Sequence, residues 1–332
     1  MKLLLLGGTV FLGRHIASLA LKKGHDLTLF NRGQSNPDLY PEVETLKGDR
    51  NGSLDSLCGR RWDAVIDTSG YIPRAVKTSA RWAADACDHY TFISTISVYD
   101  DLSKGDIEED APVGKLHDET VEEVDNQTYG PLKALCEDAV RDTFPGDALI
   151  IRPGLIVGRY DPTDRFTYWP RRVAMGGEVL VPGSPDRRVQ FIDVRDLAAW
   201  TLEMAEGGQS GTYNATGPEE PLTMIEMLKV CQSAAERDVR FTSVSEAFLL
   251  EQGVAPWIEL PLWMPTPGPM DGLMEVRCRR ALDAGLRFRP LIDTIEDTLE
   301  WVRDQPGPPY KAGMDPEREQ ELLQIWSEAA PN

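Results

Sequence analysis

The sequence is poor in the residues that build metal sites and disulfide frameworks. Its 332 residues include four widely separated histidines and five cysteines, and no two cysteines form a Cys-x-x-Cys pair. The odd number and wide spacing of the cysteines favour reduced, mostly buried thiols over a disulfide framework or a zinc site. We therefore expect no metal site built from clustered histidine and cysteine.

Basic residues and long hydrophobic runs are also scarce. The 35 lysines and arginines are outnumbered by 54 aspartates and glutamates, which gives a formal net charge of -19. Such a surface repels phosphate backbones and anionic lipids, so we expect neither nucleic acid nor membrane as a partner. The apolar start at residues 1–6 is too short for a signal peptide and runs into glycine instead of a cleavage site. These features predict a cytoplasmic protein with a small-molecule partner.

The first half of the sequence alternates short apolar runs with amphipathic stretches. Residues 2–6 form a nearly continuous apolar run, as in a strand that is covered on both faces. A helical stretch follows and ends near Gly24, a typical stop signal. Further strands are predicted at 27–30, 43–47, 64–67, 90–94 and 148–152, and helices at 75–87 and 129–143. This alternation predicts an α/β fold of the Rossmann type, with a doubly wound parallel sheet.

The pattern changes after residue 152. Residues 153–190 are rich in proline, glycine and arginine and are predicted to form loops with short helices. Strands are predicted at 189–192, 212–214 and 239–244, and helices at 194–205 and 292–302. We predict a dinucleotide-binding domain from residues 1–154 and 189–217. A smaller, mostly helical C-terminal substrate-binding domain is discontinuous and comprises residues 155–188 and 218–332.

A glycine-rich turn, GGTVFLG at residues 7–13, joins the first predicted strand to the first helix. Such a turn lets the backbone approach a pyrophosphate and aims a helix N-terminus at the anion. Gly7 and Gly13 occupy the outer positions of GxxGxxG, whereas Val10 replaces the central glycine. Its place between strand and helix favours a dinucleotide site over a plain tight turn. The candidate cofactor contacts in the turn are Gly7, Thr9, Phe11, Leu12 and Gly13.

The end of the second predicted strand bears on the choice of cofactor. An acidic residue there would bind the ribose hydroxyls of NAD and repel the extra phosphate of NADP. Here the strand ends in Asn31 and is followed by Arg32, and Arg14 is expected to face the same place. A neutral amide beside an arginine suits a 2′-phosphate, so NADP(H) is favoured over NAD(H). The alternative is that Arg32 is an ordinary exposed surface charge.

Tyr129 and Lys133 are four residues apart in the sequence YGPLK. This spacing places both side chains on one face of a helix, one turn apart. An ammonium group beside a phenol lowers the pKa of the tyrosine, which suits a general acid/base. The pair begins the helix that follows the fifth strand, at the carboxyl edge of the sheet where ligands bind. An ordinary surface tyrosine and lysine remain the alternative interpretation.

Taken together, the motifs resemble the extended short-chain dehydrogenase/reductases, the NAD-dependent epimerase/dehydratase family. The motifs occur in the family's order: GGTVFLGRH at 7–15, GDR at 48–50, FISTISVY at 92–99, YGPLK at 129–133, RPG at 152–154 and FIDVRD at 191–196. The likeness covers about residues 1–217 well. The glycine turn looks closest to that of the atypical members, which include chloroplast RNA-binding relatives.

The resemblance implies a role for each matching position. Tyr129 would be the general acid/base, Lys133 would hold the nicotinamide ribose, and Thr95 would donate a hydrogen bond to the substrate oxygen. The alternative for Thr95 is a strand-end residue that caps local backbone. The remaining implied cofactor contacts are Asp49 and Arg50 at the adenine, Ser69 and Gly70 after the fourth strand, and Pro153 beside the nicotinamide.

The implied activity is hydride transfer at a hydroxyl or carbonyl carbon of a small polar metabolite. The family's dehydratases usually carry Asp-Glu after the threonine, where this chain has Ile96 and Ser97, so dehydration is not expected. Its nucleotide-sugar epimerases usually have an arginine where this chain has Val189, which weakens that alternative without removing it. The substrate candidates are Tyr71, Ser97, Arg165, Trp169 and Arg188. For the aromatic and basic residues after 164, packing between domains is the competing interpretation.

The sequence leaves three hypotheses for the function and one for the oligomeric state. The chain is either a simple reductase or an epimerase that oxidises and re-reduces its substrate. A third hypothesis is a non-catalytic RNA-binding relative, although the acidic charge and the intact Tyr-Lys pair oppose it. The resemblance also implies a homodimer formed through the helices at 75–87 and 129–143, which the residues alone do not establish.

Overall fold

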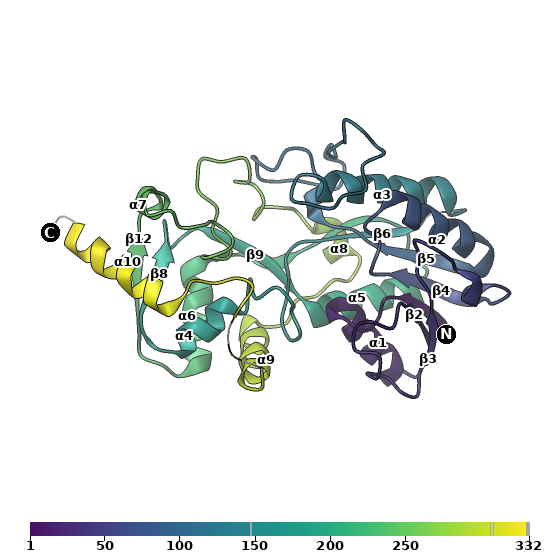
Figure 1. Ribbon diagram of the computed structural model, residues 1–332, viewed down its shortest axis with the longest axis horizontal. Helices are drawn as coiled ribbons and strands as arrows, with labels where there is room; N and C mark the ends of the chain where they lie inside the picture. The colour runs from purple at the N-terminus through teal and green to yellow at the C-terminus, as the bar shows by residue number, and fades with distance from the viewer. Residues whose placement is uncertain (147, 306, 308, 330–332) are drawn as a thin grey trace.

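Figure 1 shows the computed structural model, which describes residues 1–146, 148–305, 307 and 309–329. The last three residues of the second predicted domain, 330–332, therefore lie outside the described residues. The molecule is elongated, with the N-terminal sheet and its helices at one end and the C-terminal helix at the other. None of the described helices combines the length and the hydrophobicity needed to cross a membrane.

A parallel sheet of seven strands in the order β10-β6-β5-β4-β1-β2-β3 forms the first domain. The strands are β1 (Lys2–Leu6), β2 (Asp26–Asn31), β3 (Glu44–Lys47), β4 (Trp62–Asp67), β5 (Cys87–Ile93), β6 (Leu149–Pro153) and β10 (Gly211–Ala215). From β1 the chain winds outward to β3, then returns to β4 on the other side of β1. This reversal confirms the doubly wound Rossmann-type fold and opens a crevice at the carboxyl ends of β1 and β4.

Both faces of this sheet are covered by helices, which explains the apolar run in β1. Helices α1 (Phe11–Lys22) and α5 (Val194–Glu206) cover one face, and α2 (Pro73–Ala86) and α3 (Tyr129–Thr143) cover the other. Because successive side chains of a strand point to opposite faces, Leu3 and Leu5 join the core under α1 and α5, whereas Leu4 and Leu6 join the core under α2 and α3.

The second domain packs helices against a small parallel sheet. Its core surrounds the buried indole rings of Trp169 and Trp263. Its elements are α4 (Tyr168–Ala174), β8 (Gly177–Pro182), α6 (Met224–Ala235), β12 (Val239–Val244), α7 (Glu246–Glu251), α9 (Leu291–Arg303) and α10 (Pro316–Ala329). A sheet in the order β11 (Gly217–Thr223), β9 (Arg188–Asp193), β7 (Ile156–Val157) runs between the two domains. Short helical turns complete the chain at η1 (Asp55–Leu57), η2 (Ile96–Val98) and α8 (Arg279–Asp283).

Three strands and one packing contact differ from the predictions. Strands β7 and β8 lie within 153–190, which was expected to hold only loops and short helices, and β11 was not expected. Strand β8 pairs with β12, about sixty residues later in the chain, so the local sequence pattern does not predict it. The sequence-based division assigns Ala281 and Leu286 to the second domain, but both pack in the core under α1 and α5.

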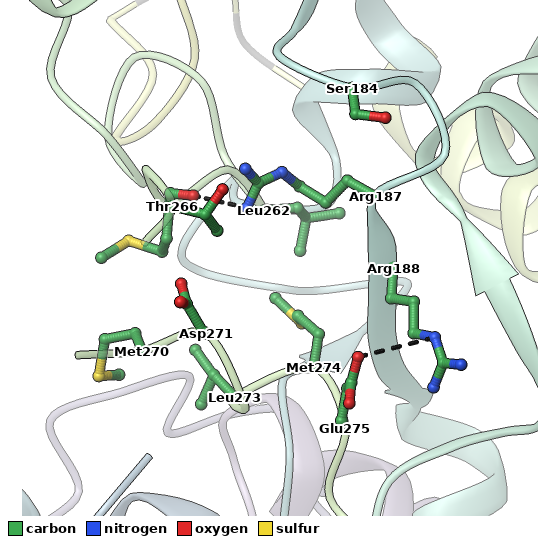
Figure 2. A pocket seen from close by; sticks show the side chains of 11 residues that line it. Ser184, Arg187, Arg188, Leu262, Thr266, Met270, Asp271, Leu273, Met274 and Glu275 are labelled. Carbon is green, nitrogen blue, oxygen red and sulfur yellow. Dashed lines mark hydrogen bonds and ion pairs between the residues drawn. The ribbon is translucent and has the colours of Figure 1, made fainter. Parts of the chain in front are cut away.

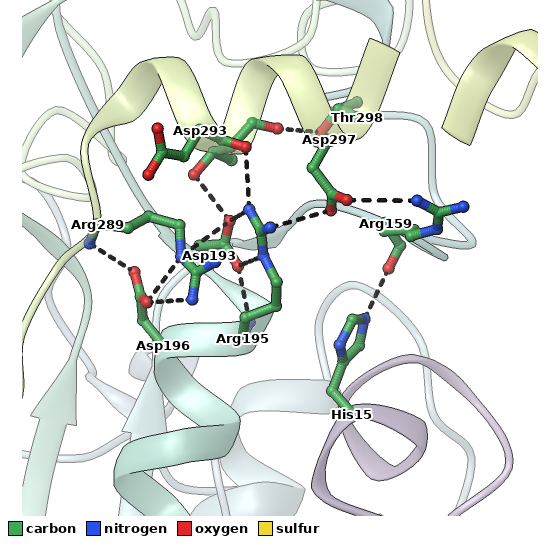
Figure 3. Close-up of polar contacts among 10 residues, drawn as sticks. His15, Arg159, Asp193, Arg195, Asp196, Arg289, Asp293, Asp297 and Thr298 are labelled. Carbon is green, nitrogen blue, oxygen red and sulfur yellow. Dashed lines mark hydrogen bonds and ion pairs between the residues drawn. The ribbon is translucent and has the colours of Figure 1, made fainter. Parts of the chain in front are cut away.

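The two domains are also joined by a network of charged side chains at the ends of α5 and α9 (Figure 3). Asp193 caps the N-terminus of α5 and is bound by Arg195 from the same domain. The Thr294 hydroxyl of α9 donates to the same carboxylate at 2.8 Å, and the Arg289 Nε lies 3.5 Å from it. Close packing of oppositely charged groups from both domains therefore fixes this junction.

Candidate active site

A cleft of about 1170 Å³ lies between the two domains, at the carboxyl ends of the central strands. It brings together residues from most of the motifs found in the sequence. The predicted residues that line it are Gly7, Thr9, Phe11, Leu12, Gly13, Asn31, Arg32, Asp49, Arg50, Ser69, Tyr71, Thr95, Ser97, Tyr129, Lys133, Pro153 and Arg165. The predicted residues that do not line it are Gly70, Trp169 and Arg188.

The glycine turn has the backbone shape that a dinucleotide needs. Gly7 and Gly8 adopt positive φ angles of 114° and 96°, and a Cβ at Gly13 would lie 2.7 Å from the backbone nitrogen of Gly8. Helix α1 begins after Val10 without a side-chain cap, so no side chain occupies the N–H groups of its first turn. Uncapped helical N–H groups at a glycine turn are an anion site. The residues present therefore fit the pyrophosphate of a dinucleotide.

The loop after β2 is shaped by Asn31 and displays Arg32. The Asn31 Oδ1 accepts from the Gly33 backbone nitrogen at 2.8 Å, and its Nδ2 donates to the Gly7 carbonyl at 3.4 Å. Arg32 is exposed on the rim of the cleft. Arg14 does not face this place as expected, because its guanidinium stacks 3.4 Å from the ring centroid of Tyr160, outside the cleft.

Arg50 lines the cleft, and its positive charge is paired with the carboxylate of Asp67. Its Nη1 and Nη2 donate to the two carboxylate oxygens of Asp67 at 2.7 and 2.6 Å. Burial raises the pKa of Asp67, but the Arg50 guanidinium outweighs burial and holds that pKa below its usual range. The pair joins the loop after β3 to the end of β4. Contacts of Asp49 and Arg50 with adenine remain predictions.

Thr95 and Tyr129 come from neighbouring elements at the end of β5. Thr95 caps η2, where its Oγ1 accepts from the Ser97 backbone nitrogen at 3.1 Å and donates to the Ser97 Oγ at 3.2 Å. Tyr129 is the first residue of α3, and the next residue, Gly130, packs so closely on the Ser97 carbonyl that a Cβ there would overlap it. This contact brings the start of α3 against the Thr95 turn.

The pKa of Tyr129 departs from the sequence-based expectation. Burial and the nearby Tyr71 raise the pKa of this phenol, and Thr95 and Arg165 only partly oppose them. Lys133 was expected to lower that pKa, but its Nζ donates to the carbonyls of Gly70 and Ile93 at 2.6 and 2.7 Å instead. In this structure the Lys133 ammonium is thus bound by two carbonyls, and its activation of Tyr129 remains a prediction.

Lys133 is almost completely enclosed, with only 2% of its surface exposed. Its ammonium lies 4.2 Å from the ring centroid of Phe92, and burial lowers its pKa from 10.5 to about 8. Gly70 takes part through its carbonyl, which binds this ammonium, and its Cβ position is filled by the Phe92 ring. Lys133 thus supplies a buried positive charge at the floor of the cleft.

Two of the substrate candidates do not line the cleft. Trp169 is fully buried in the core of the second domain, where its Nε1 donates to the Pro261 carbonyl at 2.9 Å. Arg188 lines a smaller neighbouring pocket and lies 3.7 Å from Glu275 (Figure 2). Aromatic and basic residues close in sequence need not share a site, because a helix such as α4 turns them in different directions.

Several residues that line the cleft were missed at the sequence level. The missed polar residues are Gln34, Ser35, Asn51, Thr68, Ser94, Asn126, Asp161, Thr163 and Gln190. The missed apolar residues include Met264, Met270, Leu273 and Met274 from the loop before α8. Asp161 stands four residues before Arg165 in the segment after β6, and this position at the carboxyl edge was the available signal.

The chain matches the model of the "NAD dependent epimerase/dehydratase family" over residues 3–216. It is 26% identical over 255 residues to "Epimerase family protein SDR39U1" of Bos taurus, covering 71% of this chain and 81% of that protein. It is 28% identical over 257 residues to the chloroplast stem-loop binding protein of 41 kDa b of Arabidopsis thaliana, covering 70% of this chain and 63% of that protein. The family match agrees with the resemblance drawn from the motifs.

Solved structures share the fold across both domains. The UDP-N-acetylglucosamine 4-epimerase of Bacillus cereus has a TM-score of 0.67 at 16% identity and covers 93% of this chain and 99% of its own. Human epimerase family protein SDR39U1, solved with NADPH, has a TM-score of 0.61 at 19% identity and covers 90% and 99%. WbmH of Bordetella bronchiseptica, solved with NAD+, has a TM-score of 0.65 at 17% identity and covers 91% and 98%. At these identities the likeness establishes the fold alone.

Proposed function

Because the chain belongs to the NAD-dependent epimerase/dehydratase family, we propose that it is an NAD(P)(H)-dependent oxidoreductase. It acts at a hydroxyl or carbonyl carbon of a small polar metabolite, and Tyr129 is its general acid/base. The observation that carries this proposal is one cleft lined by both the uncapped glycine turn and the Thr95–Tyr129–Lys133 set. Fold alone does not fix an activity, so the site residues bear the argument.

Each of these residues has a task in carbonyl reduction. When bound, the nicotinamide cofactor supplies the hydride that the carbonyl carbon receives. Thr95 donates a hydrogen bond to the carbonyl oxygen, where negative charge develops, and Tyr129 delivers the proton that completes the alcohol. The raised pKa of Tyr129 keeps the phenol protonated and ready to donate. The buried Lys133 ammonium adds positive charge beside the reacting centre.

NADP(H) is the proposed cofactor because of Arg32. Its guanidinium stands exposed on the rim of the cleft just after β2, and it makes no ion pair within the described part of the chain. A guanidinium in this position suits the 2′-phosphate of NADP. NAD(H) remains the second candidate, since WbmH was solved with NAD+ and human SDR39U1 with NADPH.

The test is net oxidation of NADPH by the purified protein with a panel of ketones and aldehydes. A reductase consumes NADPH, and Tyr129→Phe lowers the rate by about 10²- to 10⁴-fold while the NADPH dissociation constant is retained. A nucleotide-sugar epimerase, the second candidate, would show no net consumption and would interconvert UDP-sugars with retained cofactor. If Tyr129→Phe turned over like the wild type, this proposal would be wrong.

Two further proposals concern partners. Tight binding of a stem-loop RNA at physiological salt would favour the non-catalytic alternative, but the net charge of -19 opposes it. We also propose a homodimer that forms through helices α2 and α3. Sedimentation equilibrium measures whether the protein is a dimer.

A further inference from the structure

Asp161 is a buried carboxylate with an unused oxygen on the wall of the cleft. Only 3% of the residue is exposed, and its Oδ1 accepts from the Thr163 backbone nitrogen at 2.9 Å and from the Thr163 hydroxyl at 2.7 Å. Its Oδ2 is buried and has no hydrogen-bond partner in the described part of the chain. Buried polar atoms are nearly always satisfied, so an unsatisfied one in a cleft marks a place for a ligand group.

Arg165 lies on the same wall and is also incompletely used. Its Nε donates to the Thr163 hydroxyl at 3.2 Å, and no carboxylate among the described residues comes within ion-pair distance of its guanidinium. Burial lowers the pKa of Arg165, which the nearby Asp161 and Tyr129 partly oppose. The cleft therefore presents the Asp161 carboxylate as an acceptor and the Arg165 guanidinium as a donor, both close to Tyr129. These two charged groups do not form an ion pair with each other.

The rest of the wall from the second domain is apolar. We call this surface the methionine wall; it consists of Pro256, Trp257, Ile258, Met264, Met270, Leu273 and Met274. Four of these residues also line the neighbouring pocket, which holds two more arginines (Figure 2). Arg187 is paired with Glu246, and Arg188 with Glu275. Charge-assisted hydrogen bonds are the strong contacts to phosphate groups, and on this side of the cleft Arg165 is the arginine without an ion pair among the described residues.

Resting on the proposed function, we propose that Asp161 and Arg165 bind a substrate hydroxyl next to the reacting carbon. The hydroxyl donates to the Asp161 Oδ2 and accepts from the Arg165 guanidinium, while the methionine wall packs against an apolar body. The predicted substrate class is therefore hydroxylated carbonyl compounds that carry an aliphatic or aromatic group and no diphosphate. Met side chains adapt their shape to such bodies.

The experiment compares two ketones that differ in one hydroxyl, 2-hydroxyacetophenone and acetophenone. With the wild-type protein and NADPH we expect kcat/KM to be higher for the hydroxyl compound by about tenfold or more, because a site built to bind a hydroxyl discriminates against its absence. Asp161→Asn keeps the shape but replaces the Oδ2 acceptor with a donor, so the ratio of the two kcat/KM values falls toward about 1. A ratio is unaffected by the fraction of protein that is folded.

Asp164→Asn is the matched control. Asp164 belongs to the same segment, but its carboxylate pairs with Arg171 and accepts from the Lys311 backbone nitrogen, away from the cleft. The wild-type ratio is expected in this variant. The thermal midpoint and the NADPH dissociation constant of both variants report folding and the cofactor site separately.

The outcomes separate this inference from the proposed function. Reduction that depends on Tyr129 but shows equal kcat/KM for the two ketones, or an unchanged ratio in Asp161→Asn, overturns the inference alone. A clear preference for a UDP-sugar over both ketones also overturns it. Failure to turn over any carbonyl compound while NADPH binds overturns the proposed function and the inference together.

Discussion

The buried ammonium of Lys133 lies in the candidate site and reduces the stability of the folded protein. Its ammonium is bound by two backbone carbonyls, yet burial disfavours the charged form and lowers its pKa to about 8. A buried cation is stabilised only in part by neutral carbonyl groups. This charge therefore opposes folding wherever the ammonium is protonated, and its position at the floor of the cleft indicates a role beyond packing.

The pH dependence of stability tests this view. Between pH 8 and pH 10.5 the unfolded chain holds the proton of Lys133 whereas the folded protein has released it, so folding is favoured as pH rises through this window. A change of one in pKa corresponds to about 1.4 kcal/mol. We expect the free energy of unfolding of the wild type, relative to Lys133→Met, to increase by about 3 kcal/mol between pH 7 and pH 10.5. Urea denaturation at several pH values measures this; a flat difference would contradict it.

Arg32 is the residue on which the choice of cofactor depends. Reversing its charge in Arg32→Asp replaces attraction of the 2′-phosphate with repulsion. Charge-assisted hydrogen bonds contribute about 1.5–3 kcal/mol, so we expect the NADPH dissociation constant to rise about tenfold or more. NADH, which lacks that phosphate, is the matched control and should bind at least as well as to the wild type. Unchanged NADPH affinity in a fluorescence titration would show that Arg32 is an ordinary surface charge.

At the scale of elements, the parallel sheet was predictable and the small sheets were not. Strand β1 is buried on both faces, so its unbroken apolar run is a direct consequence of the fold. Strand β8 pairs with a strand far along the chain, starts at Gly177 with positive φ and ends in Pro182. Glycine and proline are uncommon in strands, so their presence at its ends favoured a loop in the sequence-based prediction. The strand forms because it pairs with β12.

Some residues of the candidate site could likewise be predicted from the sequence, and others could not. Residues on turns directly after a strand, such as Gly7 and Thr95, lie in the cleft because strand ends fix them. Trp169 was misplaced because it sits on α4, and the direction in which a helix turns a side chain depends on its packing. Met264 and Met274 were missed because the loop that carries them has no regular pattern. Their place depends on how the two domains meet.

Gly130 connects helix α3 to the Thr95 turn. A Cβ at this position would overlap the Ser97 carbonyl oxygen, so Gly130→Ala must push the start of α3 away from the turn. We expect kcat/KM to fall about tenfold or more, because small misplacements of a catalytic group are costly, and stability to fall by about 1–3 kcal/mol. Asp138→Ala, at an exposed position of the same helix, is the control that should change neither strongly. Steady-state kinetics and urea unfolding measure both effects.

At the scale of the whole molecule, the cleft exists only while the two domains keep their relative position. The cofactor turn and Tyr129 belong to the first domain, whereas Asp161, Arg165 and the methionine wall belong to the second. The network in Figure 3 spans this junction: Arg195 lies 3.4 Å from Asp297 of α9, and Arg159 binds the same carboxylate at 3.4 Å. His15 of α1 contacts the Arg159 carbonyl at 3.0 Å, which links the cofactor helix to the network.

Asp193 is the centre of this network and the best place to test it. Burial raises the pKa of its carboxyl, but Arg195 and Arg289 outweigh burial and hold that pKa below its usual value of 3.8. Its interactions therefore stabilise the protein above about pH 4 and are lost as the pH falls below it. Asp193→Asn removes the charge and leaves both arginines without it. Arg195 and Arg289 keep Asp297 and Asp196 as partners, so we expect a loss of about 1–3 kcal/mol at neutral pH, the usual cost of removing one partner of a charged hydrogen bond.

The loss should shrink toward pH 3, because the unfolded wild-type chain then binds a proton at Asp193 before the folded protein does, which lowers the stability of the wild type. Asp293→Asn provides the control: Asp293 lies at the start of α9 beside the network, and its exposed carboxylate makes no hydrogen bond to another described residue. Because the junction holds both walls of the cleft, Asp193→Asn should also weaken substrate binding and raise KM, while the NADPH dissociation constant, set within the first domain, changes much less. Equal stability of the two variants at neutral pH would mean that apolar packing alone holds the domains together.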